Sequence, residues 1–142
     1  MSNFNDYFMD EYRYALTNIS YTKLPSVPAP DRDDSPDIYA QDSLSVGDRV
    51  GTHIHVALLR IVEFQPESNF KLSVEFDMIF EFRKSVDPDS VQDIEIVQVL
   101  EAAPFISEVI SKASLLISQI TLIGSSTPMI LPPNYINNAE RE

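Results

Sequence analysis

Residues Phe70–Arg83, FKLSVEFDMIFEFR, decide the fold class. Every even position in this stretch carries an apolar side chain, and the odd positions are polar apart from Ile79. A period of two over this length predicts a β-strand with one buried face and one face in water. Such strands belong to antiparallel sheets, because crossover helices cover both faces of parallel ones.

The preceding stretch, Val50–Phe64, predicts the strand that pairs with it. Its apolar set changes phase at Leu58-Leu59, which suggests a bulge or a segment buried on both faces. Pro66–Asn69 reads as the hairpin connection between the two strands, and Gly47-Asp48 as a turn before them.

Two weaker strands are expected nearer the N-terminus, at Tyr12–Leu24 and Ile38–Val46. Four prolines lie between them, from Pro25 to Pro36. Since proline lacks the amide donor that a central strand needs, this segment predicts an extended connector.

One long helix follows the strands. Pro104 suits the first turn of a helix, and Gly124 suits its end. Apolar side chains recur between them at helical spacing, namely Ile106, Val109, Ile110, Ala113, Leu116, Ile117 and Ile120. Ile94–Leu100 is ambiguous between a short strand and a helical turn, and the prolines of Thr127–Ile136 predict an extended tail.

Strands grouped before a helix predict an α+β fold, a four-stranded antiparallel sheet covered on one face by one long helix. We expect a single domain over residues 12–136, flanked by a flexible N-terminal tail (1–11) and a C-terminal tail (137–142). One helix of about 20 residues covers only part of such a sheet. The remaining apolar surface predicts oligomerisation, a binding site, or both.

The amino-acid composition limits the classes of partner and of site that the protein can have. Twenty-two acidic against ten basic residues give a net charge of −12, which disfavours nucleic acid and anionic membranes as partners. The chain has no cysteine, so disulfides and thiolate zinc sites are excluded. The apolar run at Leu115–Ile123 is interrupted by polar residues and is expected to stay out of the bilayer. The acidic N-terminus lacks a signal-peptide pattern, which predicts a cytoplasmic protein.

Few residues in the sequence are candidates for catalysis or metal binding. His53 and His55 share one face of a strand and could hold a metal only with a third ligand such as Glu63. The solvent-facing side of the strand Phe70–Arg83 carries three acidic residues, Glu75, Asp77 and Glu81. They could form an acid/base pair or a cation site, although a solvated strand face is the simpler interpretation. The three glycines form no phosphate-binding loop. We therefore expect neither an enzyme nor a cofactor.

Several strings, in order, resemble the SecB family of protein-export chaperones. Ile19–Lys23 (ISYTK) runs into a proline-containing stretch, and the long hairpin strands follow. The helix PFISEVISKASLLISQIT from Pro104 resembles the family's main helix. It is followed by Gly124, Pro128 and Leu131–Tyr135 (LPPNY), similar to the family's Pro-x-Asn-aromatic element. The resemblance covers roughly residues 12–136.

This resemblance implies an ATP-independent holdase that assembles as a dimer of dimers and binds unfolded client proteins in hydrophobic grooves. It places client-binding roles on Tyr39, Phe70 and Ile110. The translocase motor ATPase is a further family partner, but the acidic positions offered to it carry Leu24, Pro28 and Ser73 here. The family's C-terminal helix is also missing or reduced. Guarding an antitoxin or a phage product is an open alternative to export.

Two hypotheses from other classes remain. One is a small-molecule enzyme or binding protein that uses His53, His55 and Glu63. An enclosed cavity would favour it, whereas an open groove would favour the chaperone. The other is a purely structural oligomer without chaperone activity.

Overall fold

The computed structural model describes residues 3–25, 37–65, 70–125, 128–132 and 135–136. Its elements follow the order α1 (Phe4–Tyr7), β1 (Phe8–Lys23), β2 (Asp37–Val50), β3 (His53–Gln65), β4 (Phe70–Phe82), the 3-10 turn η2 (Pro88–Ser90), α2 (Asp93–Glu101) and α3 (Ile106–Ser125). The expected connector over 26–36, the hairpin connection at 66–69 and the C-terminal tail at 137–142 lie outside the described residues.

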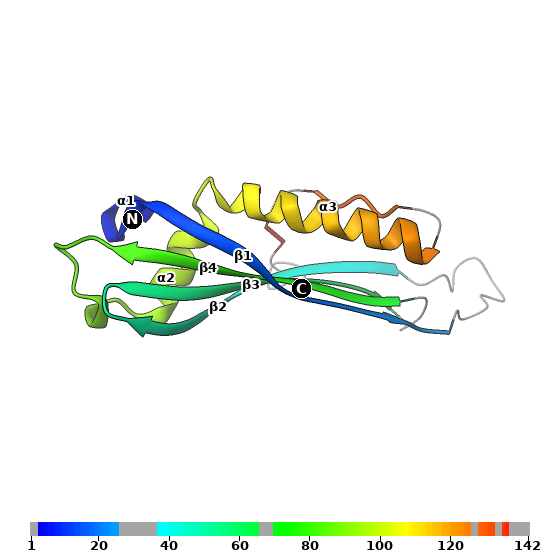
Figure 1. The fold of residues 1–142 in the computed structure, drawn as a ribbon, viewed down its shortest axis with the longest axis horizontal. Coiled ribbons are helices and arrows are strands. Elements are labelled where there is room, and N and C mark those ends of the chain that lie inside the picture. Colours follow the sequence, from blue (N-terminus) through cyan, green and yellow to red (C-terminus); the bar gives the residue numbers. More distant parts are fainter. Residues whose placement is uncertain (1–2, 26–36, 66–69, 126–127, 133–134, 137–142) are drawn as a thin grey trace.

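The strands form one antiparallel sheet in the order β1-β4-β3-β2 (Figure 1). The prediction of a four-stranded antiparallel sheet is confirmed. The two strands with the strongest sequence patterns, β3 and β4, occupy its centre, and the weaker strands β1 and β2 form its edges. This placement follows from burial, because a central strand needs apolar side chains and an edge strand tolerates polar ones.

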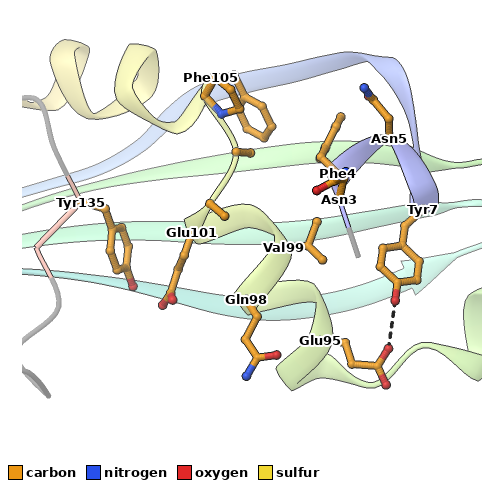
Figure 2. A pocket seen from close by; sticks show the side chains of 13 residues that line it. Asn3, Phe4, Asn5, Tyr7, Glu95, Gln98, Val99, Glu101, Phe105 and Tyr135 are labelled. Carbon is orange, nitrogen blue, oxygen red and sulfur yellow. Dashed lines mark hydrogen bonds between the residues drawn. The ribbon is translucent and has the colours of Figure 1, made fainter. Parts of the chain in front are cut away.

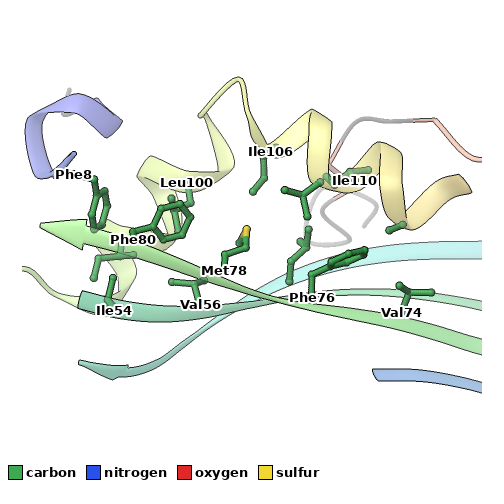
Figure 3. Packing of buried hydrophobic residues seen from close by; sticks show 14 of the residues in the cluster. Phe8, Ile54, Val56, Val74, Phe76, Met78, Phe80, Leu100, Ile106 and Ile110 are labelled. Atoms are coloured by element: carbon green, nitrogen blue, oxygen red, sulfur yellow. The ribbon is translucent and has the colours of Figure 1, made fainter. Parts of the chain in front are cut away.

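The alternation in β4 divides the sheet into two faces. Its even residues, from Phe70 to Phe82, are buried, whereas its odd residues are exposed or half-buried. Paired residues of antiparallel neighbours share a face, so the registers extend this division across all strands. We call the side that packs under the helices the helix face, and the opposite side the open face. Figure 3 shows Val74, Phe76, Met78 and Phe80 pointing from β4 toward the helices.

Two details of the β2–β3 hairpin differ from expectation. No bulge occurs at Leu58-Leu59, where β3 pairs regularly with both neighbours. The unbroken apolar run instead reflects a central strand whose open-face residues, Leu59 among them, are half-buried between neighbours. Gly47-Asp48 is not the turn either. It lies at a register shift within β2, and the chain turns at Gly51, whose φ of 62° suits a residue without a side chain.

The expectation of one covering helix is wrong, because in the described part of the chain α1 and α2 pack against the core in addition to α3. The ambiguous segment before Pro104 forms α2, with Ile96 and Leu100 fully buried. The expected N-terminal tail is wrong for residues 3–11, because α1 precedes Phe8, which is 0% exposed and lies 4.9 Å from the Phe82 ring. Scattered aromatics that looked like tail residues thus belong to the core.

Helix α3 has two apolar sides. One packs on the sheet and is buried, through Ile106, Val109, Ile110, Ala113 and Ile117. The other carries Leu115, Leu122 and Ile123, which are 56%, 51% and 87% exposed. Because both sides are apolar, Ile106–Gly124 is long enough, with a mean hydropathy of 1.4, to pass as a membrane-spanning helix by length and composition. In the structure it is the main cover of the sheet.

Gly124 is the penultimate residue of α3, which ends at Ser125, next to the position where the sequence predicts its end. A Cβ at this position would come within 2.5 Å of the Tyr21 hydroxyl on β1. The glycine therefore permits a close approach between the helix and the edge strand.

Candidate functional site

An open cleft lies at one end of the molecule, between the N-terminal residues and α2 (Figure 2). Its volume is about 1280 Å³. One wall is Asn3–Tyr7 without Asp6, and the other is α2 with the connection to α3. Val99, Phe105 and Tyr135 contribute apolar surface from the second wall and from the C-terminal segment. A cleft of this size could hold a segment of several residues but not enclose a small molecule.

Aromatic packing fixes the floor of the cleft. The Phe105 ring lies 4.4 Å from Tyr12, 5.0 Å from Phe4 and 5.4 Å from Phe80, centroid to centroid. The short helix α1 is held in addition by Arg83, whose backbone N–H donates to the Tyr7 carbonyl at 2.8 Å. These contacts connect the N-terminal wall of the cleft to the wall formed by α2 and its connection to α3.

The charged groups of the cleft are acidic. Glu95 accepts a hydrogen bond from the Tyr7 hydroxyl at 3.3 Å (Figure 2). Burial, and then the neighbouring Glu101 carboxylate, raise the pKa of Tyr135, which stays a neutral donor. No Lys, Arg or His is among the residues that line this cleft in the described part of the chain. The described lining of the cleft therefore combines apolar side chains with carboxylates.

The three predicted client-binding residues do not line this cleft, and the structure does not bring them together. Tyr39 is half-buried on β2 and pairs with Glu63 on the open face. Phe70 is on the helix face, 4% exposed, with its ring 5.0 Å from Phe64 and 5.7 Å from Tyr21. Ile110 is 0% exposed under α3. Their client-binding role stays a prediction, and in the single chain only Tyr39 is accessible.

The candidate metal ligands are also separated. His55 Nδ1 lies 2.9 Å from Asp77 Oδ2 in an open-face pair, while Glu63 Oε2 lies 3.8 Å from Lys71 Nζ. Eight residues along a strand separate His55 from Glu63 by roughly 26 Å. Among the described residues no group of three His, Cys, Asp or Glu side chains could hold a metal ion. The set His53, His55 and Glu63 is therefore not a site.

A buried ion pair lies on the helix face of the sheet, between the edge strand β2 and its neighbour β3. Arg60 Nε is 3.0 Å from Asp42 Oδ1, and the two side chains are 1% and 0% exposed. Burial raises the pKa of Asp42, against the opposing effect of the Arg60 guanidinium and the Ile136 N–H. The signal in the sequence was a charge at an apolar position of each strand. Asp42 stands between Ala40 and Leu44, and Arg60 between Leu58 and Val62.

This ion pair holds the C-terminal segment. Arg60 Nη1 donates to the Pro132 carbonyl at 2.9 Å and to Ser114 Oγ at 2.5 Å. The Ile136 N–H donates to Asp42 Oδ2, and the Asp42 N–H donates to the Ile136 carbonyl, both at 2.8 Å. The segment expected to be extended is thus anchored to the edge strand β2 through Asp42 and to the central strand β3 through Arg60.

No protein-family model matches the chain, and no curated protein matches it. Among solved structures it is similar to a SecB-like chaperone of Mycobacterium tuberculosis in complex with a ChAD peptide from the HigA1 antitoxin. The TM-score is 0.58 at 12% identity, over 85% of this chain and 88% of that chain. It is also similar to a protein of unknown function from Streptococcus agalactiae, with a TM-score of 0.44 at 12% identity over 85% and 96% of the two chains. The first likeness shows that the fold is SecB-like, as the sequence resemblance implied.

Proposed function

We propose that this protein is an ATP-independent holdase that binds unfolded or nascent proteins. The observation that carries the proposal is a SecB-like fold that presents an open cleft lined by aromatic, apolar and acidic side chains. The solved neighbour is a chaperone in complex with a peptide, which supports peptide binding as the use of this fold.

The physics agrees with this role. Burying apolar surface is worth about 25 cal/mol per Å², whatever the sequence of the segment that covers it. The cleft would therefore hold apolar and aromatic segments of many proteins. A net charge of −12 keeps a protein with such surfaces soluble. The open cleft also disfavours the alternative of a small-molecule enzyme, whose substrate would need an enclosed site.

The test is suppression of aggregation of an unfolded client, with and without ATP. Wild-type protein should suppress aggregation equally in both conditions. Ala102→Trp should weaken client binding by about tenfold, because Ala102 lines the cleft and a bulky ring would fill it without removing a packed side chain. Ile94→Trp is the matched control, since Ile94 is exposed on α2, the helix that ends directly before Ala102, but does not line the cleft.

Two outcomes would count against the proposal. Failure of the wild-type protein to suppress aggregation would remove the chaperone role. Equal binding by the Ala102→Trp and Ile94→Trp variants would remove the cleft as the client site.

We also propose that the chain acts in the cytoplasm as a dimer of dimers. The exposed side of α3 supports assembly, because Leu115, Leu122 and Ile123 would be covered by a second copy. Delivery to a translocase motor is the weaker form of the proposal. An antitoxin-like client is the stronger one, since the solved neighbour holds an antitoxin peptide.

A further inference from the structure

The C-terminal strap, defined as residues 128–132 and 135–136, lies across α3 and β2 without being helix or strand. Its apolar side chains Met129, Leu131 and Tyr135 pack against the core but remain half-exposed, and Ile130 is 82% exposed. The strap is therefore a surface-bound segment that covers the core from outside.

The hydrogen bonds described above between the buried pair and the strap go to main-chain groups of the strap. Arg60 Nη1 donates to the Pro132 carbonyl. The Asp42 carboxylate accepts from the Ile136 N–H, and the Asp42 N–H donates to the Ile136 carbonyl. At the other end of the strap, the Met129 N–H donates to Thr121 Oγ1 at 2.7 Å. Thr121 is itself 1% exposed. Three buried polar residues thus recognise backbone groups that any extended peptide carries.

A buried ion pair is a weak device for stability, since apolar residues of similar volume often do as well. It suits peptide recognition better, because a backbone offers an acceptor to Arg60 and a donor to Asp42. Main-chain bonds at a sheet edge combined with half-open apolar contacts are how domains take up extended peptides.

We infer that the strap site, formed by Asp42, Arg60 and Thr121, is a second peptide-binding site, and that the strap is its displaceable occupant. An extended client segment with an apolar side chain where Leu131 lies would replace it. The inference rests on the proposed holdase function and adds a regulatory step, because a client that enters this site must first release the strap.

Hydrogen exchange of the full-length wild-type chain tests the displacement. A permanently unfolded, reduced and alkylated protein is added until it is bound. The amides of Met129 and Ile136 are then expected to exchange about tenfold faster, because opening of the strap frees both donors. The amide of Ala113, in the buried middle of α3, should not change. A bound client with unchanged strap amides would refute the displacement.

Two single substitutions in the strap form a matched pair. Leu131→Ala removes a packed side chain, whereas Ile130→Ala removes an exposed one. The synthetic peptide PMILPPNYI, residues 128–136, should bind the Leu131→Ala variant several-fold more tightly than wild type, because the internal competitor is weakened. Ile130→Ala should bind like wild type. Equal binding by all three proteins would mean that the strap is fixed and would overturn the inference.

The two proposals can fail separately. If the peptide binds the Leu131→Ala variant but no unfolded protein binds, the holdase function fails and the strap site stands. If unfolded proteins bind without releasing the strap, the holdase function stands and the strap site fails.

Discussion

Breaking the Asp42–Arg60 pair from one side should destabilise the protein strongly. Arg60→Met leaves the Asp42 carboxylate buried with the hydrogen bond from the Ile136 N–H but without the neighbouring guanidinium charge. Removing one partner of a buried pair typically costs about 3–5 kcal/mol, because the other charge stays uncompensated. The variant also loses the bonds from Arg60 to Pro132 and Ser114. We therefore expect a loss near the upper end of that range.

The double variant Asp42→Leu/Arg60→Met should be more stable than either single variant. It removes both charges, so no uncompensated group stays buried, and apolar side chains fill the space. The lost hydrogen bonds to the strap and Ser114 set its remaining cost at about 1–3 kcal/mol. The expected coupling between the two sites is thus at least about 2 kcal/mol.

Urea unfolding followed by circular dichroism measures these free energies. A domain of this kind has a total stability of about 5–15 kcal/mol, so the single variants are best studied near 15 °C. Protein concentration is held constant, because assembly would add to the apparent stability. If Arg60→Met costs less than about 1 kcal/mol, or the double variant is as unstable as the single ones, the pair is not the buried anchor described above.

Three further predictions follow from local contacts. Gly51→Val should cost about 1–2 kcal/mol in urea unfolding, because Gly51 has a φ of 62° and a side chain is strained there although no atom lies within 4 Å of an added Cβ; an unchanged stability would contradict this. Burial, followed by the Glu108 carboxylate, raises the pKa of Tyr12 to about 12 in the folded protein. Because the unfolded chain therefore loses this proton at lower pH, the free energy of unfolding should fall as the pH rises from 10 toward 12. Tyr12→Phe should flatten that fall, and an unchanged slope would contradict it. Leu115→Glu/Leu122→Glu should dissociate the oligomer in light scattering and leave the sheet side of α3 intact, whereas a monomeric wild type would refute assembly.

Phe70, to which the family resemblance gives a client-binding role, is as buried as Phe76. The exposed fractions of the two residues are 4% and 5%. We now expect Phe70→Ala and Phe76→Ala to destabilise the protein equally, by about 3–5 kcal/mol. Phe70 is buried because the Tyr21 ring stacks on it and the Phe64 ring contacts it edge-on. These rings come from β1 and β3, and a linear pattern does not reveal which strands flank a given one.

The sequence by itself determined the elements that depend on local periodicity. The alternation from Phe70 to Phe82 and the helical spacing from Ile106 to Ile120 reflect which side chains must leave water, and both were correct. The order of strands and helix determined the α+β class in the same way.

The tertiary structure alone decided what depends on contacts between distant residues. Phe4, Phe8 and Phe105 are about 100 residues apart at the extremes and meet in one aromatic cluster that shapes the cleft. Asp42 and Arg60 became a pair because register placed them opposite each other, and the strap reached them from more than 70 residues away. Burial of a charge is tolerated only with a partner, and the partner is chosen by the fold and not by the neighbouring sequence.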